Sequence, residues 1–306
     1  MDISRPAAVA LCVTGMILVG SSVSISQLLL DYPLLTGQAI RYAAAALALF
    51  AIARAFPRFG AGRAPRVRPT RRELTILTAL AATGMAAFNA CILVALEHAD
   101  AAVVGTVIGA APLGLALLGP MLRGARPASR LVAAAAIVVA GTALVQGTGR
   151  ADAIGLLAAA GALAGEIAFT MFAAAVLPSL GAVRVAAWSS ALAVPLLLVG
   201  GLVLGEATRL RMPTATEALA LTYLAVLMTV VAFIVWFVGL QRLGVERAGM
   251  IVGVMPIATL TTAAIMAGAL PGLGQTLGVL TVAAGLALGL TTQEPAPRSA
   301  VRTASA

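Results

Sequence analysis

Charged side chains are scarce in this sequence. Only 10% of its 306 residues are charged, whereas a soluble domain of this size carries about 25%. So few polar groups cannot coat a globule, and a disordered chain would be richer in charge. With 61% hydrophobic residues and a mean hydropathy of +1.05, the chain is predicted to cross a membrane several times. Its apolar runs are continuous and about 20 residues long, which favours helices over barrel strands.

Residue types that build chemical sites are also scarce. The sequence has no Lys, one His and two cysteines, Cys12 and Cys91, which both lie inside apolar runs. Neither cysteine has a ligand partner at close spacing, so we expect no metal site and no cofactor. Phosphate-binding loops, zinc motifs and nucleophile elbows are missing from the sequence, so we do not expect an enzyme or an ATP-driven pump.

Ten apolar segments are long enough to cross roughly 30 Å of hydrocarbon as helices. The predicted fold class is therefore an all-α integral membrane protein with ten transmembrane helices. The predicted spans are 7–30, 34–53, 74–96, 101–122, 129–147, 154–177, 181–204, 217–240, 246–267 and 272–291.

The net charge of +9 comes from arginines that lie between the spans, so it indicates membrane orientation and not nucleic-acid binding. With the N-terminus in the cytoplasm, sixteen arginines lie inside and three outside. Seven of the sixteen fall in the connection 54–73. We therefore predict a multi-pass protein of the cell inner membrane with both termini cytoplasmic. The segment 293–306 is predicted to be a disordered cytoplasmic tail.

The chain repeats itself at an offset of 144 residues, most clearly in an eight-residue frame, GxxxGxxP. The same offset relates Gly141 to Gly285 and Leu96 to Leu240. The frame residues are Gly105, Gly109 and Pro112 in the fourth span and Gly249, Gly253 and Pro256 in the ninth.

Each half then has five spans, and an odd number forces the second half into the opposite orientation. We predict two inverted repeats, 1–147 and 154–292, an architecture of secondary transporters that places the site between the halves. The frame glycines allow close helix packing. The frame prolines remove backbone hydrogen bonds, so they act either as packing kinks or as hinges.

Four stretches of the sequence match motifs of a known family: Gly20-Ser21-Ser22, Arg41-Tyr42, and the stretches from Leu96 to Pro112 and from Leu243 to Pro256. Through them the sequence resembles the EamA type of the drug/metabolite transporter superfamily, over nearly its whole length. The resemblance implies a carrier that moves small metabolites, often exporting amino acids or drugs.

Two charged residues stand out deep within predicted spans, where a charge is costly and marks a pathway or a pair. Arg41 lies roughly 10 Å and Glu166 roughly 18 Å below the outer surface, counting 1.5 Å per residue. Their depths allow an Arg41–Glu166 ion pair. We hypothesise that Glu166 binds the coupling proton or a substrate amine and that Arg41 binds a carboxylate. The alternative for Arg41 is that its side chain extends to the outer interface. The alternative for Glu166 is an ion pair or hydrogen bond with a purely structural role.

Five further residues are candidates for substrate binding. Asn89 is either an interhelical contact or a substrate contact. Ser21 and Ser22 either bond their own helix or border water. Trp188 and Trp236 are either interface anchors or walls of a cavity.

The inverted repeats, together with what the resemblance implies, predict a secondary active transporter that exports small metabolites, such as amino acids or related amphipathic compounds, by alternating access. The alternatives are a facilitator or uptake carrier for another small solute or drug and, more remotely, an integral-membrane transferase. The expected partners are a small-molecule substrate and the lipid bilayer, without nucleic acid. These motifs do not specify the substrate, the direction of flux, the coupling ion or the oligomeric state.

Overall fold

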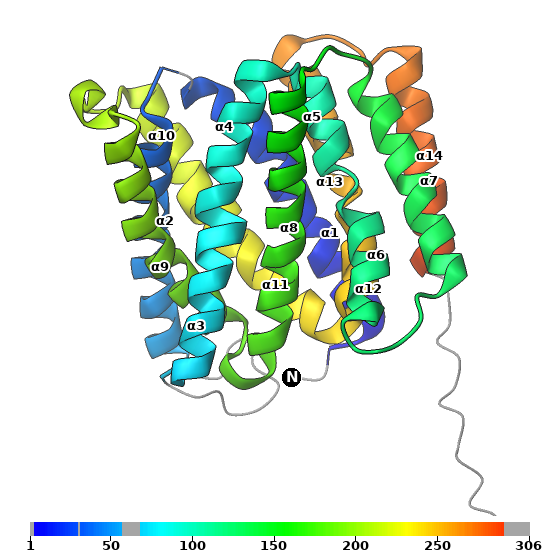
Figure 1. Ribbon diagram of the computed structural model, residues 1–306, viewed down its shortest axis with the longest axis horizontal. Coiled ribbons are helices and arrows are strands. Elements are labelled where there is room, and N and C mark those ends of the chain that lie inside the picture. The colour runs from blue at the N-terminus through cyan, green and yellow to red at the C-terminus, as the bar shows by residue number, and fades with distance from the viewer. Residues whose placement is uncertain (1–2, 30, 57–67, 291–306) are drawn as a thin grey trace, which may run out of the picture.

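The computed structural model describes residues 3–29, 31–56 and 68–290. Within them, ten helical segments are long and apolar enough to cross a membrane. They stand side by side in one bundle (Figure 1), which confirms the predicted all-α fold with ten spans. The predicted tail 293–306 and most of the arginine-rich connection lie outside the described residues.

Six spans consist of one α-helix each, and the first continues into a short 3-10 turn, η1 (Gln27–Leu29). These six helices are α1 (Arg5–Ser26), α2 (Leu34–Ala55), α7 (Ser129–Gln146), α8 (Ala153–Leu180), α9 (Ala182–Val203) and α14 (Leu273–Leu290).

The other four spans are composite. The third and eighth contain a π-helical segment in their middle, and the fourth and ninth are broken into two α-helices. The parts are α3 (Arg71–Leu80), η2 (Ala81–Ala87) and α4 (Phe88–His98); α5 (Ala101–Ile108) and α6 (Ala111–Met121); α10 (Ala215–Tyr223), η4 (Leu224–Val231) and α11 (Ala232–Leu243); and α12 (Val245–Ile251) and α13 (Val254–Ala267). A 3-10 turn, η3 (Glu206–Arg209), lies between α9 and α10.

The third and eighth spans begin with the same capping box. Thr70 accepts a hydrogen bond from the Glu73 amide, and the Glu73 carboxylate accepts one from the Thr70 amide. Thr214 and Glu217, 144 residues later, repeat the arrangement. A capping box satisfies amides at the start of a helix. The third span therefore begins at Arg71, three residues before its predicted start.

The two repeats run in opposite directions. Helices α3 and α4 begin 144 residues before α10 and α11. The last helices of the repeats, α7 and α14, lie antiparallel: Gly141 faces Val282, whereas Gly285 faces Val138. Their small residues allow this close packing. The architecture is thus two inverted five-helix repeats, as the sequence predicts.

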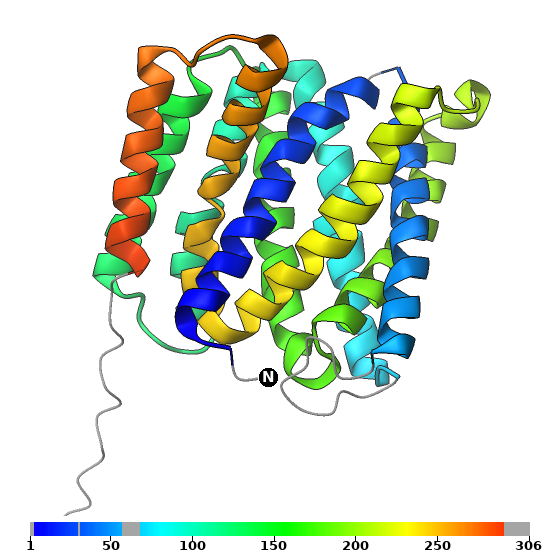
Figure 2. The ribbon, with the colours of Figure 1, turned by 180° about the vertical axis from the view of Figure 1, so that it is seen from behind.

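Two helix pairs form the edges of the bundle, α2 with α9 and α7 with α14, and the remaining spans lie between them. Figure 2 shows α1 and the composite eighth span crossing the back of the bundle obliquely. We call the end where α1 begins and α6 ends the arginine-rich end. Most described arginines lie there, whereas Arg150, Arg209 and Arg211 lie at the opposite end.

Candidate functional site

Glu166 lies at the midpoint of α8, with thirteen residues of the helix before it and fourteen after it. At 1.5 Å per residue, its Cα is about 20 Å from either helix end. The side chain is half-buried, and the described residues give it no hydrogen bond or ion pair. A carboxylate at such a depth is costly and is a candidate functional group by default.

The neighbours of Glu166 on α8 show which helices surround it. A Cβ at Gly165 would lie 2.8 Å from the Thr83 carbonyl oxygen of η2, so the two helices nearly touch there. On the other side, Ile167 packs against Gly114 of α6. Glu166 lies between these contacts on the helix surface, on the arc that carries the buried residues of α8. Its carboxylate therefore belongs to the interior of the bundle.

An aromatic cluster lies about one turn from Glu166, toward the arginine-rich end. Phe169 of α8 meets Phe233 and Phe237 of α11, with ring centroids 5.3 and 5.6 Å away. The centroids of Phe233 and Phe237 are 5.7 Å apart. Aromatic pairs at these separations stabilise each other beyond the burial of their area. Sequence analysis did not identify this cluster, because its residues come from two distant spans.

The repeated Gly and Pro frame coincides with the helix breaks. In the fourth span the α-helix is interrupted at Gly109 and Ala110, and in the ninth at Val252 and Gly253. The amides of Ala110, Val252 and Gly253 donate to carbonyls three residues back, as in a tighter turn, for example Ala110 N to Val107 O at 3.1 Å. The α-helix is therefore interrupted at the frame in both repeats; a kink at the prolines and its use as a hinge stay predictions.

The frame glycines are also packing sites. Gly105 and Gly109 lie against Gln146 and Thr142 of α7, within the first repeat. Their counterparts in the second repeat lie against the first: Gly249 faces Leu115 of α6, and Gly253 faces Val138 of α7. A Cβ at Gly109, Gly249 or Gly253 would overlap Thr142, Leu115 or Val138, so these three glycines allow close packing whether or not the frame bends. Pro112 and Pro256 are both buried beside the breaks.

The predicted Arg41–Glu166 ion pair is wrong for the described structure. Arg41 lies on α2, which packs against α9 and η4, whereas Glu166 lies on α8. The Arg41 guanidinium carbon is 4.2 Å from the centroid of the Tyr42 ring, a favourable cation–π contact. Depths within side-chain reach of each other did not imply that the two helices are neighbours.

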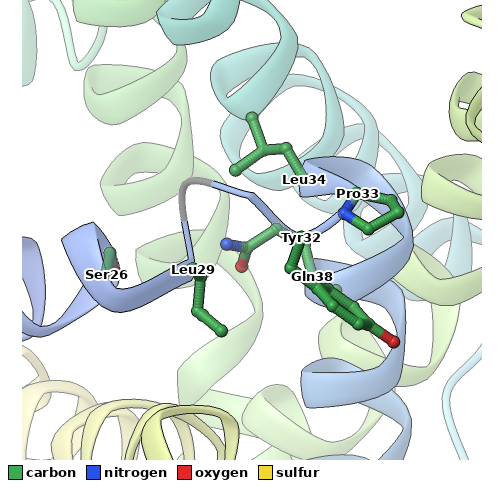
Figure 3. Close-up of a pocket in the computed structure, with 7 residues that line it drawn as sticks. Ser26, Leu29, Tyr32, Pro33, Leu34 and Gln38 are labelled. Atoms are coloured by element: carbon green, nitrogen blue, oxygen red, sulfur yellow. The ribbon is translucent and has the colours of Figure 1, made fainter. Parts of the chain in front are cut away.

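Arg41 also does not snorkel to the surface, because only 5% of it is exposed. Its Nε is buried without a hydrogen-bond partner, and so is Oε1 of Gln38, one turn earlier on α2. Gln38 lines a small cavity of about 20 Å³ with Ser26 and Tyr32 (Figure 3). This volume holds about one water molecule, so the cavity is too small for a metabolite.

The two serines of α1 and Asn89 bond within their own helices. Ser21 donates to the Leu18 carbonyl at 3.0 Å, Ser22 to the Val19 carbonyl at 2.7 Å, and the Asn89 amide to the Met85 carbonyl at 2.6 Å. Ser21 alone also reaches the other repeat, 2.7 Å from the hydroxyl of Tyr223. Sequence analysis missed this tyrosine at the end of α10.

The two tryptophans have different surroundings. Trp236 is 3% exposed in the core, so it is not an interface anchor. Trp188 is half-buried and meets the ring of Phe50 edge-on, with centroids 5.4 Å apart. Among the described residues, no hydrogen bond, ion pair or ring contact joins any two of the seven predicted substrate-binding residues. Their common role in binding stays a prediction.

At the end opposite the arginines, the loops α4–α5 and α7–α8 are tied together. His98 Nδ1 lies 2.8 Å from Asp152 Oδ2, and Asp100 accepts a hydrogen bond from the Arg150 amide at 2.7 Å. The Gly155 amide, followed by His98, lowers the pKa of Asp152 below its usual value. In the described part of the chain, no group of three or more His, Cys, Asp or Glu side chains could hold a metal ion.

Comparison with known protein families matches residues 6–146 and, separately, residues 153–291 to the EamA-like transporter family. Each match covers one inverted repeat. The chain belongs to the EamA-like transporter family. As an EamA-like protein it is a membrane transporter of small solutes, which agrees with the resemblance seen in its sequence.

A solved structure described as "Crystal structure of protein" shares the fold of this EamA-like chain. The TM-score is 0.75 at 19% sequence identity, and the alignment covers 93% of this chain and 96% of the other. A search of curated protein sequences finds no match to the chain.

Proposed function

We propose that this EamA-like protein is a secondary active transporter that exports small amphipathic metabolites, such as amino acids, by alternating access. Glu166 is proposed to carry the coupling proton or to bind the substrate's amine. The observation that carries the proposal is the half-buried, unpartnered carboxylate at the midpoint of α8. Inverted repeats favour a site at this depth, because rocking one half against the other exposes it alternately.

Arg41 and the polar residues of α1 are proposed to complete substrate binding. The buried Nε of Arg41 has no partner and is free to bond a substrate carboxylate. The hydrogen bond between Ser21 and Tyr223 joins the two repeats. A substrate hydroxyl or amine that hydrogen-bonds to both side chains would therefore contact both repeats at once. Ser22, Asn89, Trp188 and Trp236 remain proposed lining residues.

We also propose that the arginine-rich end faces the cytoplasm, in the inner membrane of the cell. The excess of arginine at that end supports this orientation through the positive-inside rule. Reporter domains fused at either terminus, one active only inside the cell and one only outside, test it. Activity of the outside reporter at either terminus would contradict the proposal.

The coupling proposal is tested by solute flux in proteoliposomes with and without an imposed pH gradient, using labelled amino acids and cationic drugs. In the wild type we expect flux that follows the gradient. Glu166→Gln keeps the shape of the side chain but cannot carry the proton, so its flux should no longer follow the gradient. The matched control is Glu97→Gln, at the exposed end of α4, which should behave as wild type.

Two results would overturn parts of the proposal. Flux of the wild type that ignores the pH gradient, and is unchanged in Glu166→Gln, would indicate a facilitator in which Glu166 is structural. Gradient-driven flux into the compartment that represents the cytoplasm, under conditions that favour export, would indicate an uptake carrier.

A further inference from the structure

The two ends of the bundle are closed by different helix pairs, although the repeats are related by a shift of 144 residues: α1 packs against α13 at the end opposite the arginines. At the arginine-rich end, α6 packs against α12, and α8 packs against α11. The shift of 144 residues relates the α6–α12 pair to α13 and α5, and the α8–α11 pair to α1 and α4. These equivalent pairs lie toward the opposite end. Within the described residues, neither of these pairs shares more than isolated contacts.

Three layers of contact close the arginine-rich end below Glu166. The first is the aromatic cluster of Phe169, Phe233 and Phe237. In the second, the Gln241 amide of α11 donates to the Leu177 carbonyl of α8 at 2.6 Å. Both of these layers join the first helix of the second repeat, α8, to a later helix of the same repeat.

The third layer joins the two repeats at the surface. Arg123, which follows α6, forms an ion pair with Glu246 at the start of α12. Gly119 makes this contact close, because a Cβ there would lie 3.0 Å from the Glu246 carboxylate oxygen. The side chain of Arg123 is 56% exposed and that of Glu246 18%. An exposed pair is weak, so it can break and reform as the bundle moves.

We infer that the aromatic cluster and the Arg123–Glu246 pair form the gate of the arginine-rich end, and that the structure shows this gate closed. Opening it requires α11 and α12 to move away from α8 and α6. The breaks between α12 and α13, and the π segment η4 before α11, lie where these helices would bend. Glu166 then becomes accessible from the arginine-rich end.

The test measures accessibility and does not require transport, so it can fail or succeed independently of the proposed function. The test uses a variant with Glu166→Cys, in which Cys12→Ala and Cys91→Ala remove the native thiols. The variant is treated with a membrane-impermeant cationic thiol reagent from each side of oriented vesicles. Arg68→Cys and Arg150→Cys mark the two sides. We expect the cysteine at position 166 to react from the end opposite the arginines and to be protected from the arginine-rich end.

Breaking the gate should remove the protection. Phe237→Ala should raise the rate of labelling from the arginine-rich end by roughly tenfold, the scale of an aromatic contact. Arg123→Glu should raise it by up to about fivefold, the scale of an exposed ion pair. The double variant Arg123→Glu/Glu246→Arg should restore protection. Arg126→Glu, an exposed arginine on the same loop, is the control for charge and should have no effect.

Equal labelling from both ends before any gate substitution would overturn the inference. So would unchanged labelling in both Arg123→Glu and Phe237→Ala, provided that size-exclusion profiles show folded protein. If Phe237→Ala does not fold, Phe237→Leu replaces it, because the leucine keeps an apolar side chain but removes the ring contacts.

Discussion

Helices α4 and α11 occupy equivalent places in the two repeats but carry different side chains at equivalent positions. The shift of 144 residues aligns Asn89 with Phe233 and Leu93 with Phe237. In α11 the two rings pack against α8 at the closed end. In α4, Asn89 turns back to bond its own helix. The two helices thus begin at equivalent positions of the repeats, while α11 carries two rings where α4 carries an amide and a smaller apolar side chain.

The largest effect is expected from removing the aromatic contact that distinguishes α11. Phe237 is fully buried, so Phe237→Ala leaves a cavity and should lower the free energy of unfolding by about 3–5 kcal/mol. The equivalent change in the first repeat, Leu93→Ala, affects a smaller, half-buried side chain and should cost less. Thermal unfolding in detergent measures both. If Leu93→Ala lowered the free energy of unfolding as much as Phe237→Ala, the expected difference between the two helices would be contradicted.

Glycine packing should show the next largest effect. A Cβ at Gly253 would overlap Val138 across the repeats, so Gly253→Ala should destabilise by about 1–3 kcal/mol. Gly274→Ala in α14 is the control, because nothing lies near its Cβ position. Chemical unfolding in mixed micelles compares the two variants. If both glycines tolerate alanine equally, close approach at the frame is not required.

The two capping boxes offer a smaller and sharper comparison. Thr70→Ala and Thr214→Ala should each cost about 0.5–2 kcal/mol, as loss of an N-cap does. The second should cost more, because Glu217 is 5% exposed and its carboxylate also holds Arg211, at 2.5 Å. Thermal unfolding of the two variants under identical conditions provides the measurement, and a larger loss in Thr70→Ala would contradict it.

The smallest effect concerns acid at the end opposite the arginines. The pKa of Asp152 is lowered in the folded chain by Gly155 and His98, so its stabilising contribution is present above the unfolded pKa of about 3.9. It is lost as pH falls through the folded pKa. Asp152→Asn keeps the helix cap but removes the titration. We expect its unfolding temperature to fall less than that of wild type between pH 5 and the acid limit, each referenced to pH 7.

Much of the fold could be predicted from the sequence, because hydropathy and the GxxxGxxP frame depend on single helices and short spacings. The Thr70 and Glu73 pattern, repeated at Thr214 and Glu217, was also readable and would have placed two helix starts correctly. Lateral neighbours were not readable. Arg41 and Glu166 were paired by depth alone, yet α2 packs against α9, its partner at the edge of the bundle, and not against α8.

The π segments were not predictable either, because their sequences, such as Ala81–Ala87, contain no residue that requires the wider turn. The first packs against α8 and α9, and the second against α2 and α1. The proposed coupling residue is different: a single acidic residue amid apolar ones is visible in any sequence, and Glu166 could be chosen without a structure. Its surroundings, including Phe169, could not.

The π segments have a consequence for how such a chain tolerates length changes. Deleting one residue from an α-helix rotates everything beyond it by about 100°, which would turn the buried face of a span toward lipid. A π segment already holds more residues per turn than an α-helix. A one-residue deletion within Ala81–Ala87 or Leu224–Val231 can therefore be taken up by reversion to α-helix, with the flanking halves kept in register. These two stretches are the places inside the spans where we expect homologous chains to differ in length.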